Sequence, residues 1–183
     1  MTQSRIGGRA QGGAHTDAEN DDARKALIDA LSRWASGVAV LSLRDDGRAF
    51  GITVTAFSSV SLDPPLILVC LGRNAVVVPA LQNDGAEFVV SVLAEDQRRL
   101  ASIFTDVGPL GRDAFAAEGP PLLPGALASI VCRIEVMHEA GDHWIAVGRV
   151  QDVVLGPRGK PLLRYEREWR GLGSGPRADP PAR

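Results

Sequence analysis

The stretch "GITVTAFSSVSLDPPLILVCL", residues 51–71, contains two kinds of predicted strand with a turn between them. Its first part alternates β-branched and aromatic residues with small hydroxyl residues, which is typical of a strand that has one apolar face. The double proline at 64–65 predicts a turn, and the apolar run 65–71 predicts a strand buried on both faces. Small hydroxyl side chains beside accessible backbone suit a flat polar ligand, but threonine is also a good strand former and serine a turn former. Both interpretations remain open on composition alone.

The residues before this stretch predict a hairpin preceded by a helix. Residues 37–57 read as two strands around the Asp-Asp-Gly turn at 45–47, which is a strong hairpin signal. Upstream, apolar residues recur at the spacing of one helix face, at Leu27, Ala30, Leu31 and Trp34. We expect an amphipathic helix that ends near Gly37 and packs on another surface.

The residues after this stretch predict two more helices and three more strands. In chain order they are a short helix over 74–83 with Pro79 in its first turns, a strand over 86–93, a helix over 94–104 with acidic residues at its start, a loop over 105–125, and two long antiparallel strands within 126–156 that turn at 139–142. No alternation of parallel strands and helices is visible. We therefore expect a mainly β (α+β) fold, with six or seven antiparallel strands in a closed or nearly closed barrel and two or three flanking helices.

Length and composition limit the organisation and the compartment. The 183 residues suit one domain, expected at 22–170, between Gly-, Pro-, Asp- and Arg-rich tails at 1–21 and 171–183 that we expect to be disordered. Neither a secretory signal nor an apolar segment long enough to cross a membrane is visible, so a cytoplasmic protein with no membrane partner is expected.

Charge and cysteine usage exclude two classes of partner. A formal net charge of −2 argues against a general nucleic-acid binder. Cys70 and Cys132 lack the spacing of metal ligands, so we expect no metal site and two buried, reduced thiols.

Five segments taken together resemble one protein family. They are "LSRWASGVAVLSL" (31–43), the stretch quoted above (51–71), "FVVSVLAEDQ" (88–97), "GDHWIAVGRV" (141–150) and "PLLRYERE" (161–168). In this order they resemble the flavin reductase family, the reductase components of two-component flavin-dependent monooxygenases, from about residue 26 to residue 170. The resemblance implies an FMN-binding split β-barrel and a homodimer.

The resemblance also implies a set of site residues. Thr53, Val54, Thr55 and Ala56 would line the flavin ring, and Ser59 and Ser61 would reach its ribityl chain or phosphate. Arg73 and Asn74 would contact the phosphate; the alternative for Arg73 is a solvated surface charge. The family commonly carries further Ser or Thr after this arginine, whereas here the chain reads "NAVVV" (74–78). His143, in the predicted turn, would face the nicotinamide as the catalytic residue, and Asp142 would shape that turn.

The function implied is an NAD(P)H:flavin oxidoreductase. It would move hydride from NADH or NADPH to FMN or FAD and supply reduced flavin to a separate oxygenase. The alternatives are a split-barrel module that binds flavin without turnover, and a barrel oxidase that acts on a bound organic substrate. The sequence leaves open the choices between FMN and FAD and between NADH and NADPH.

Overall fold

The computed structural model describes residues 17–105, 114–115 and 118–173. The chain divides after Trp34 into two units, which we describe separately.

The first unit contains one helix, α1 (Asp17–Ser32). The helix predicted from Leu27 to Trp34 is present, but it starts at Asp17, inside the segment 1–21 that we expected to be a disordered tail; residues 1–16 lie outside the described residues. Its apolar residues Leu27 and Leu31 are more than half exposed, at 58% and 60%. The helix ends at Ser32, before the predicted stop at Gly37.

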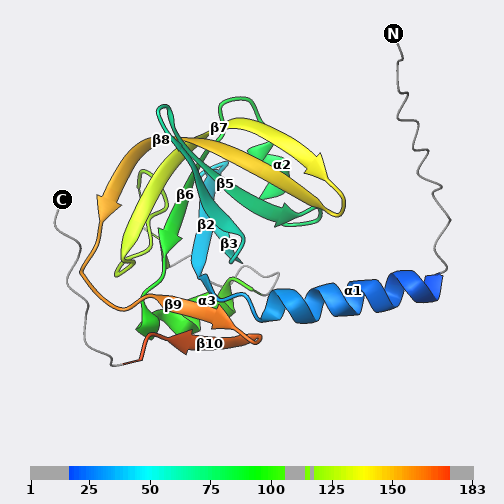
Figure 1. The fold of residues 1–183 in the computed structure, drawn as a ribbon. Coiled ribbons are helices and arrows are strands. Elements are labelled where there is room, and N and C mark those ends of the chain that lie inside the picture. Colours follow the sequence, from blue (N-terminus) through cyan, green and yellow to red (C-terminus); the bar gives the residue numbers. More distant parts are fainter. Residues whose placement is uncertain (1–16, 106–113, 116–117, 174–183) are drawn as a thin grey trace, which may run out of the picture. The chain divides into compact units, whose positions relative to one another are not determined.

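The second unit is built on a seven-stranded antiparallel sheet (Figure 1). Its spatial order is β3 (Arg48–Val54), β2 (Ala39–Asp45), β6 (Glu87–Val92), β7 (Ala128–Ala140), β8 (His143–Leu155), β5 (Pro65–Gly72) and β4 (Phe57–Leu62). The predicted hairpin turn is present between β2 and β3, where Asp46 and Gly47 have positive φ angles of 45° and 73°. The antiparallel, mainly β fold predicted from the sequence is confirmed.

The connection between β3 and β4 closes the sheet into a barrel. These two strands lie at opposite edges of the sheet, yet only Thr55 and Ala56 separate them in the chain. So short a link requires the two edges to approach each other, and the amide of Cys70 on β5 donates to the carbonyl of Ala56 at 2.9 Å. The segment 51–57 is therefore not one continuous strand, as predicted, but two edge strands joined at the opening of a split barrel.

A second, three-stranded sheet was not predicted. It consists of β1 (Ser36–Gly37), β9 (Leu162–Tyr165) and β10 (Glu168–Gly171), in the order β1-β9-β10. Arg164 on β9 lies over the ring of Trp169 on β10, 4.3 Å from the ring centre. The four-residue strands β9 and β10 are too short to show a clear alternation in the sequence.

Both short helices predicted for the second unit are present, but the first, predicted over 74–83, spans only Val78–Leu81. They are α2 (Val78–Leu81), with Pro79 in its first turn, and the 3₁₀ turn η1 (Glu95–Gln97), which continues into α3 (Arg98–Ile103). Much of the loop predicted over 105–125 lies outside the described residues. None of the described helices is long and apolar enough to cross a membrane.

The barrel interior is a close-packed apolar core. Leu41, Val69, Leu71 and Phe88 belong to one cluster and are almost fully buried. A Cβ at Gly148 on β8 would overlap the ring of Phe88, so the glycine leaves room for that ring. Both cysteines are free. Cys132 is fully buried, as predicted, whereas Cys70 is only partly buried, contrary to the prediction of two buried thiols.

Candidate functional site

A hollow at one end of the barrel brings together three of the predicted site residues. Its volume is about 670 Å³, and it is lined by Ile52, Gly72, Arg73, Asn74, Ala75, Gly141, Asp142 and His143. We call it the Arg73–His143 hollow. Its residues come from β3, from the turn after β5 and from the turn between β7 and β8.

Strand pairing explains why residues 70 positions apart meet here. The last residue of β5, Gly72, is the register partner of the first residue of β8, His143. The turn that follows β5 is therefore placed beside the β7–β8 turn, in which Gly141 has a positive φ of 61°. The turn predicted at 139–142 is present but shorter, at Gly141 and Asp142, because Glu139 and Ala140 still pair with β8, and His143 follows it directly.

His143 is held by its neighbour in the sequence. Its Nδ1 lies 2.6 Å from Oδ1 of Asp142, and the side chains are 50% and 91% exposed. The contact favours the ring orientation in which Nδ1 faces Asp142 and Nε2 points away from that carboxylate. Asp142 thus orients a ring, in addition to its predicted place in the turn.

Arg73 is tied to the same turn. Its backbone amide donates to the carbonyl of Asp142 at 2.9 Å, and its Nη2 donates to the carbonyl of Gly141 at 2.7 Å. Nη2 also lies 2.6 Å from Oε1 of Glu139. Arg73 is therefore neither a freely solvated charge nor an unpaired phosphate ligand. Glu139 is a residue that sequence reasoning missed, because an exposed glutamate at a strand end carries no signal of its partner.

The link between β3 and β4 lies close to the hollow. The carbonyl of Ala56 accepts a hydrogen bond from the amide of Cys70. Cys70 lies two positions before Gly72 along β5, a distance of about 7 Å. Thr55 and Ala56 are both exposed. The structure thus places these two predicted flavin contacts near the hollow, although they do not line it.

Thr53 and Val54 are used mainly by the fold. The hydroxyl of Thr53 donates to the carbonyl of Ala101 at 2.7 Å, and its amide donates to the carbonyl of Phe104 at 3.0 Å. The side chain of Val54 is only 5% exposed and belongs to the barrel core. Any ligand contact at these two positions would have to come from backbone atoms, because the Thr53 hydroxyl is hydrogen-bonded within the fold and the Val54 side chain is buried in the core.

Ser59 and Ser61 lie away from the hollow. Ser59 is the register partner of Ile67, five residues before Gly72 on β5, which is about 17 Å along the strand. The hydroxyl of Ser61 accepts a hydrogen bond from the amide of Asp63 at 3.2 Å and so stabilises the β4–β5 turn. The structure does not bring these serines together with Arg73 and Asn74.

Burial explains two of the three valines in "NAVVV", whereas Val76 is 49% exposed. Val77 is fully buried and Val78 is 4% exposed, both within the barrel core. Hydroxyl side chains at these positions would point into apolar surroundings rather than towards a phosphate. Phosphate binding at this turn would therefore rely on Arg73, on Asn74 and on backbone amides.

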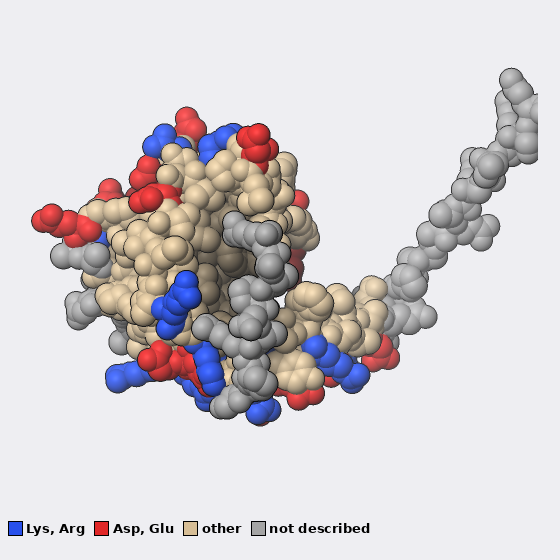
Figure 2. All heavy atoms as spheres, turned by 60° about the vertical axis from the view of Figure 1, so that its left-hand side comes forward, with Lys and Arg blue, Asp and Glu red and all other residues tan. Residues whose placement is uncertain are grey.

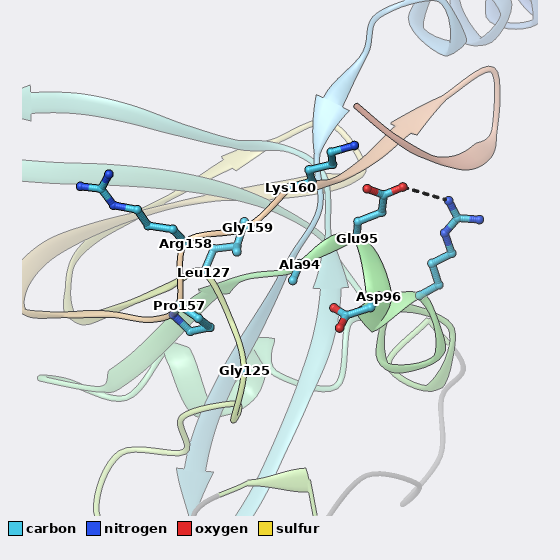
Figure 3. A pocket seen from close by; sticks show the side chains of 10 residues that line it. Ala94, Glu95, Asp96, Gly125, Leu127, Pro157, Arg158, Gly159 and Lys160 are labelled. Carbon is cyan, nitrogen blue, oxygen red and sulfur yellow. Dashed lines mark ion pairs between the residues drawn. The ribbon is translucent and has the colours of Figure 1, made fainter. Parts of the chain in front are cut away.

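A second cavity of about 770 Å³ lies where β6 ends (Figure 3). Among its lining residues are Glu95, Asp96, Arg158 and Lys160, and Glu95 pairs with Arg98 at 3.9 Å. None of the predicted site residues lines it. Its mixed charges give no preference for one class of ligand.

The described residues contain no group of three His, Cys, Asp or Glu side chains that could hold a metal. On the face shown in Figure 2, described Lys and Arg residues are interspersed with Asp and Glu instead of forming one positive patch.

The volume of the Arg73–His143 hollow, about 670 Å³, falls within the range of about 300–1,000 Å³ that small-molecule pockets measure. Its guanidinium and side-chain amide can donate hydrogen bonds to a phosphate, and its imidazole can bond to a polar group of a ligand.

Comparisons with known proteins identify relatives of the chain. The chain is 39% identical over 149 residues to the 4-hydroxyphenylacetate 3-monooxygenase reductase component of Thermus thermophilus, covering 81% of this chain and 97% of that protein. It is 37% identical over 151 residues to an NADH-dependent flavin reductase of Rhodococcus sp, covering 80% and 85%. The structure of the Streptomyces globisporus NADH:FAD oxidoreductase SgcE6 with NAD and FAD fragments matches with a TM-score of 0.76 and 31% identity, covering 84% and 94%. The family model "Flavin reductase like domain" matches residues 31–173, and the chain therefore belongs to the flavin reductase family.

Proposed function

We propose that this protein is an NADH-dependent flavin reductase that releases reduced FMN or FAD to a separate monooxygenase. The observation that carries the proposal is the meeting of Arg73, Asn74 and His143 in one hollow beside the exposed link at Thr55 and Ala56. Relatives named as NADH-dependent flavin reductases and as monooxygenase reductase components support it.

The two nucleotides supply the chemistry, a hydride transfer from reduced nicotinamide to flavin that is completed by a proton from solvent. The chain's part is binding and orientation. Arg73 and Asn74 hold a phosphate, backbone groups at Thr55 and Ala56 meet the edge of the flavin ring, and His143 orients the nicotinamide. No further acid or base is required of the protein.

Two further properties belong to this proposal. We expect a homodimer, because Leu62 on β4 and Leu155 on β8 are 92% and 80% exposed in the single chain. We expect a cytoplasmic location, because both thiols are free.

Steady-state NADH oxidation with added FMN, FAD or riboflavin tests the function. We expect turnover with free flavin and bleaching of the flavin's visible absorbance when NADH is added under nitrogen. Flavin binding without oxidation of either NADH or NADPH would indicate a non-catalytic flavin-binding module instead.

A further inference from the structure

The guanidinium of Arg73, at the hollow, already contacts other groups of the protein. One of its terminal nitrogens, Nη2, contacts two oxygens at once, Oε1 of Glu139 at 2.6 Å and the carbonyl of Gly141 at 2.7 Å. Both oxygens belong to the β7–β8 hairpin, Glu139 near the end of β7 and Gly141 in the turn before His143.

The position of this nitrogen decides what else the guanidinium can bind. A guanidinium has two edges that can grip a phosphate with a pair of parallel N–H groups, one formed by Nη1 and Nη2 and the other by Nε and Nη2. Both edges include Nη2. A phosphate that binds Arg73 through two N–H groups therefore uses Nη2 and must compete there with the Glu139 carboxylate, which lies 2.6 Å away.

Of the two oxygens, the one on Glu139 can leave. Its side chain is 56% exposed and flexible, whereas the carbonyl of Gly141 is part of the backbone of a tight turn. An exposed ion pair contributes little to stability, so its exchange for a phosphate costs little. The backbone contacts from Arg73 to Gly141 and Asp142 persist during the exchange, so the turn stays in place.

We propose that Glu139 is the resident counter-ion of a phosphate site at Arg73, and that it sets the affinity of the hollow for phosphate-bearing nucleotides by competing with them for Nη2. The inference rests on the proposed function only in taking the nucleotide to be a flavin or nicotinamide nucleotide. Glu139 is thus a specificity-determining residue, which weakens binding through the phosphate and leaves the ring contacts unchanged.

The direction of the effect distinguishes Glu139 from an ordinary binding residue. Glu139→Gln removes the competing charge and its repulsion of the phosphate, so FMN should bind about threefold to fivefold more tightly. Riboflavin, which lacks the phosphate, should bind as it does to the wild-type protein. The gain should shrink between about 0.01 M and about 1 M salt, where the screening length falls from about 30 Å to about 3 Å.

A matched control lies on the neighbouring strands. Glu87 on β6 pairs with Arg133 on β7 at 2.9 Å, with side chains 57% and 54% exposed, close to the 56% and 54% of Glu139 and Arg73. Glu87→Gln removes the same kind of exposed ion pair and the same charge, away from the hollow. It should leave the affinity for FMN unchanged.

The test is equilibrium titration of FMN and riboflavin into the wild-type protein, Glu139→Gln, Glu87→Gln and the double variant Glu139→Gln/Arg73→Ala, followed by flavin fluorescence without NADH. Tighter FMN binding in Glu139→Gln alone, lost when Arg73 is also replaced, is the expected result. Unchanged or weaker FMN binding, or equal gains for FMN and riboflavin, would overturn the inference. The proposed function fails on a separate observation, namely that the wild-type protein oxidises no NADH with any flavin. If no variant binds FMN, both the proposed function and the inference about Glu139 are overturned.

Discussion

The imidazole Nδ1 of His143 and the carboxylate Oδ1 of Asp142 lie 2.6 Å apart at the start of β8. Because one ring nitrogen is engaged by the carboxylate, contact with a nicotinamide falls to Nε2 and the ring edge. His143 also pairs in register with Gly72, which places it opposite the turn that carries Arg73 and Asn74. Histidine, carboxylate and guanidinium thus belong to one rim of the hollow.

His143→Ala should slow NADH oxidation much more than it weakens flavin binding. The ring is expected to fix the nicotinamide in the reacting geometry, so kcat should fall about tenfold, or about 1.4 kcal/mol in the barrier. Steady-state kinetics with saturating flavin measure the change. His138→Ala, an exposed histidine on β7, is the control and should behave as wild type. Wild-type rates in His143→Ala would place the nicotinamide elsewhere.

Asp142→Ala should produce a weaker version of the same defect. Loss of the carboxylate frees the ring, and a hydrogen bond of about 1 kcal/mol corresponds to a loss of about fivefold in kcat/KM for NADH. Asp142→Asn keeps an acceptor oxygen and should recover most of the rate. If Asp142→Ala still slows a variant that already carries His143→Ala by the same factor, then Asp142 acts independently of the ring.

Arg73→Ala should weaken FMN much more than riboflavin. A hydrogen bond to a charged group is worth about 1.5–3 kcal/mol, and exchange with Glu139 favours the low end, so we expect a loss of about tenfold for FMN. Fluorescence titration of both ligands measures it. Equal losses for FMN and riboflavin would mean that Arg73 supports the turn without touching the phosphate.

Thr53→Val should destabilise the fold without changing flavin affinity. It removes the hydrogen bond from the Thr53 hydroxyl to Ala101 on α3, at a cost of about 1 kcal/mol. The carbonyl of Ala101 keeps the bond from Thr105, so no buried acceptor is left without a partner. For a chain of this size the melting temperature should fall by about 2–4 °C. Thr55→Val, at an exposed position, is the control for the change in melting temperature. A large loss of flavin affinity in Thr53→Val would mean that the Thr53 hydroxyl contacts the flavin.

Cys132 should resist alkylation and should make stability depend on alkaline pH. Burial raises the pKa of its thiol from 9.0 to about 12, so the folded protein keeps the neutral form while the unfolded chain ionises above pH 9.0. The stabilising contribution is complete below pH 9.0 and is lost as the pH rises towards about 12. Measured by denaturant unfolding between these two pH values, the free energy of unfolding should fall more steeply with pH for the wild-type protein than for Cys132→Ala. Equal slopes would show that the thiol ionises as readily in the folded protein.

Local sequence signals determined those elements whose geometry depends on neighbouring residues. The turn at Asp46 and Gly47 requires positive φ angles that these residue types accept, and Pro79 suits only the first turn of a helix. The alternation of β7 and β8 follows from the twofold period of a half-buried strand. His143 could be placed at a turn for the same reason, since Gly141 precedes it.

The tertiary structure alone decided the contacts between residues far apart in the chain. Nothing in the sequence around Thr53 indicates that its hydroxyl donates a hydrogen bond to Ala101. Nothing in the sequence around Arg73 indicates that its guanidinium pairs with Glu139. The same holds for the split between β3 and β4 and for the distance of Ser59 from the hollow. These relationships depend on strand order and register, which arise from the packing of the whole barrel, so local propensity and period cannot specify them.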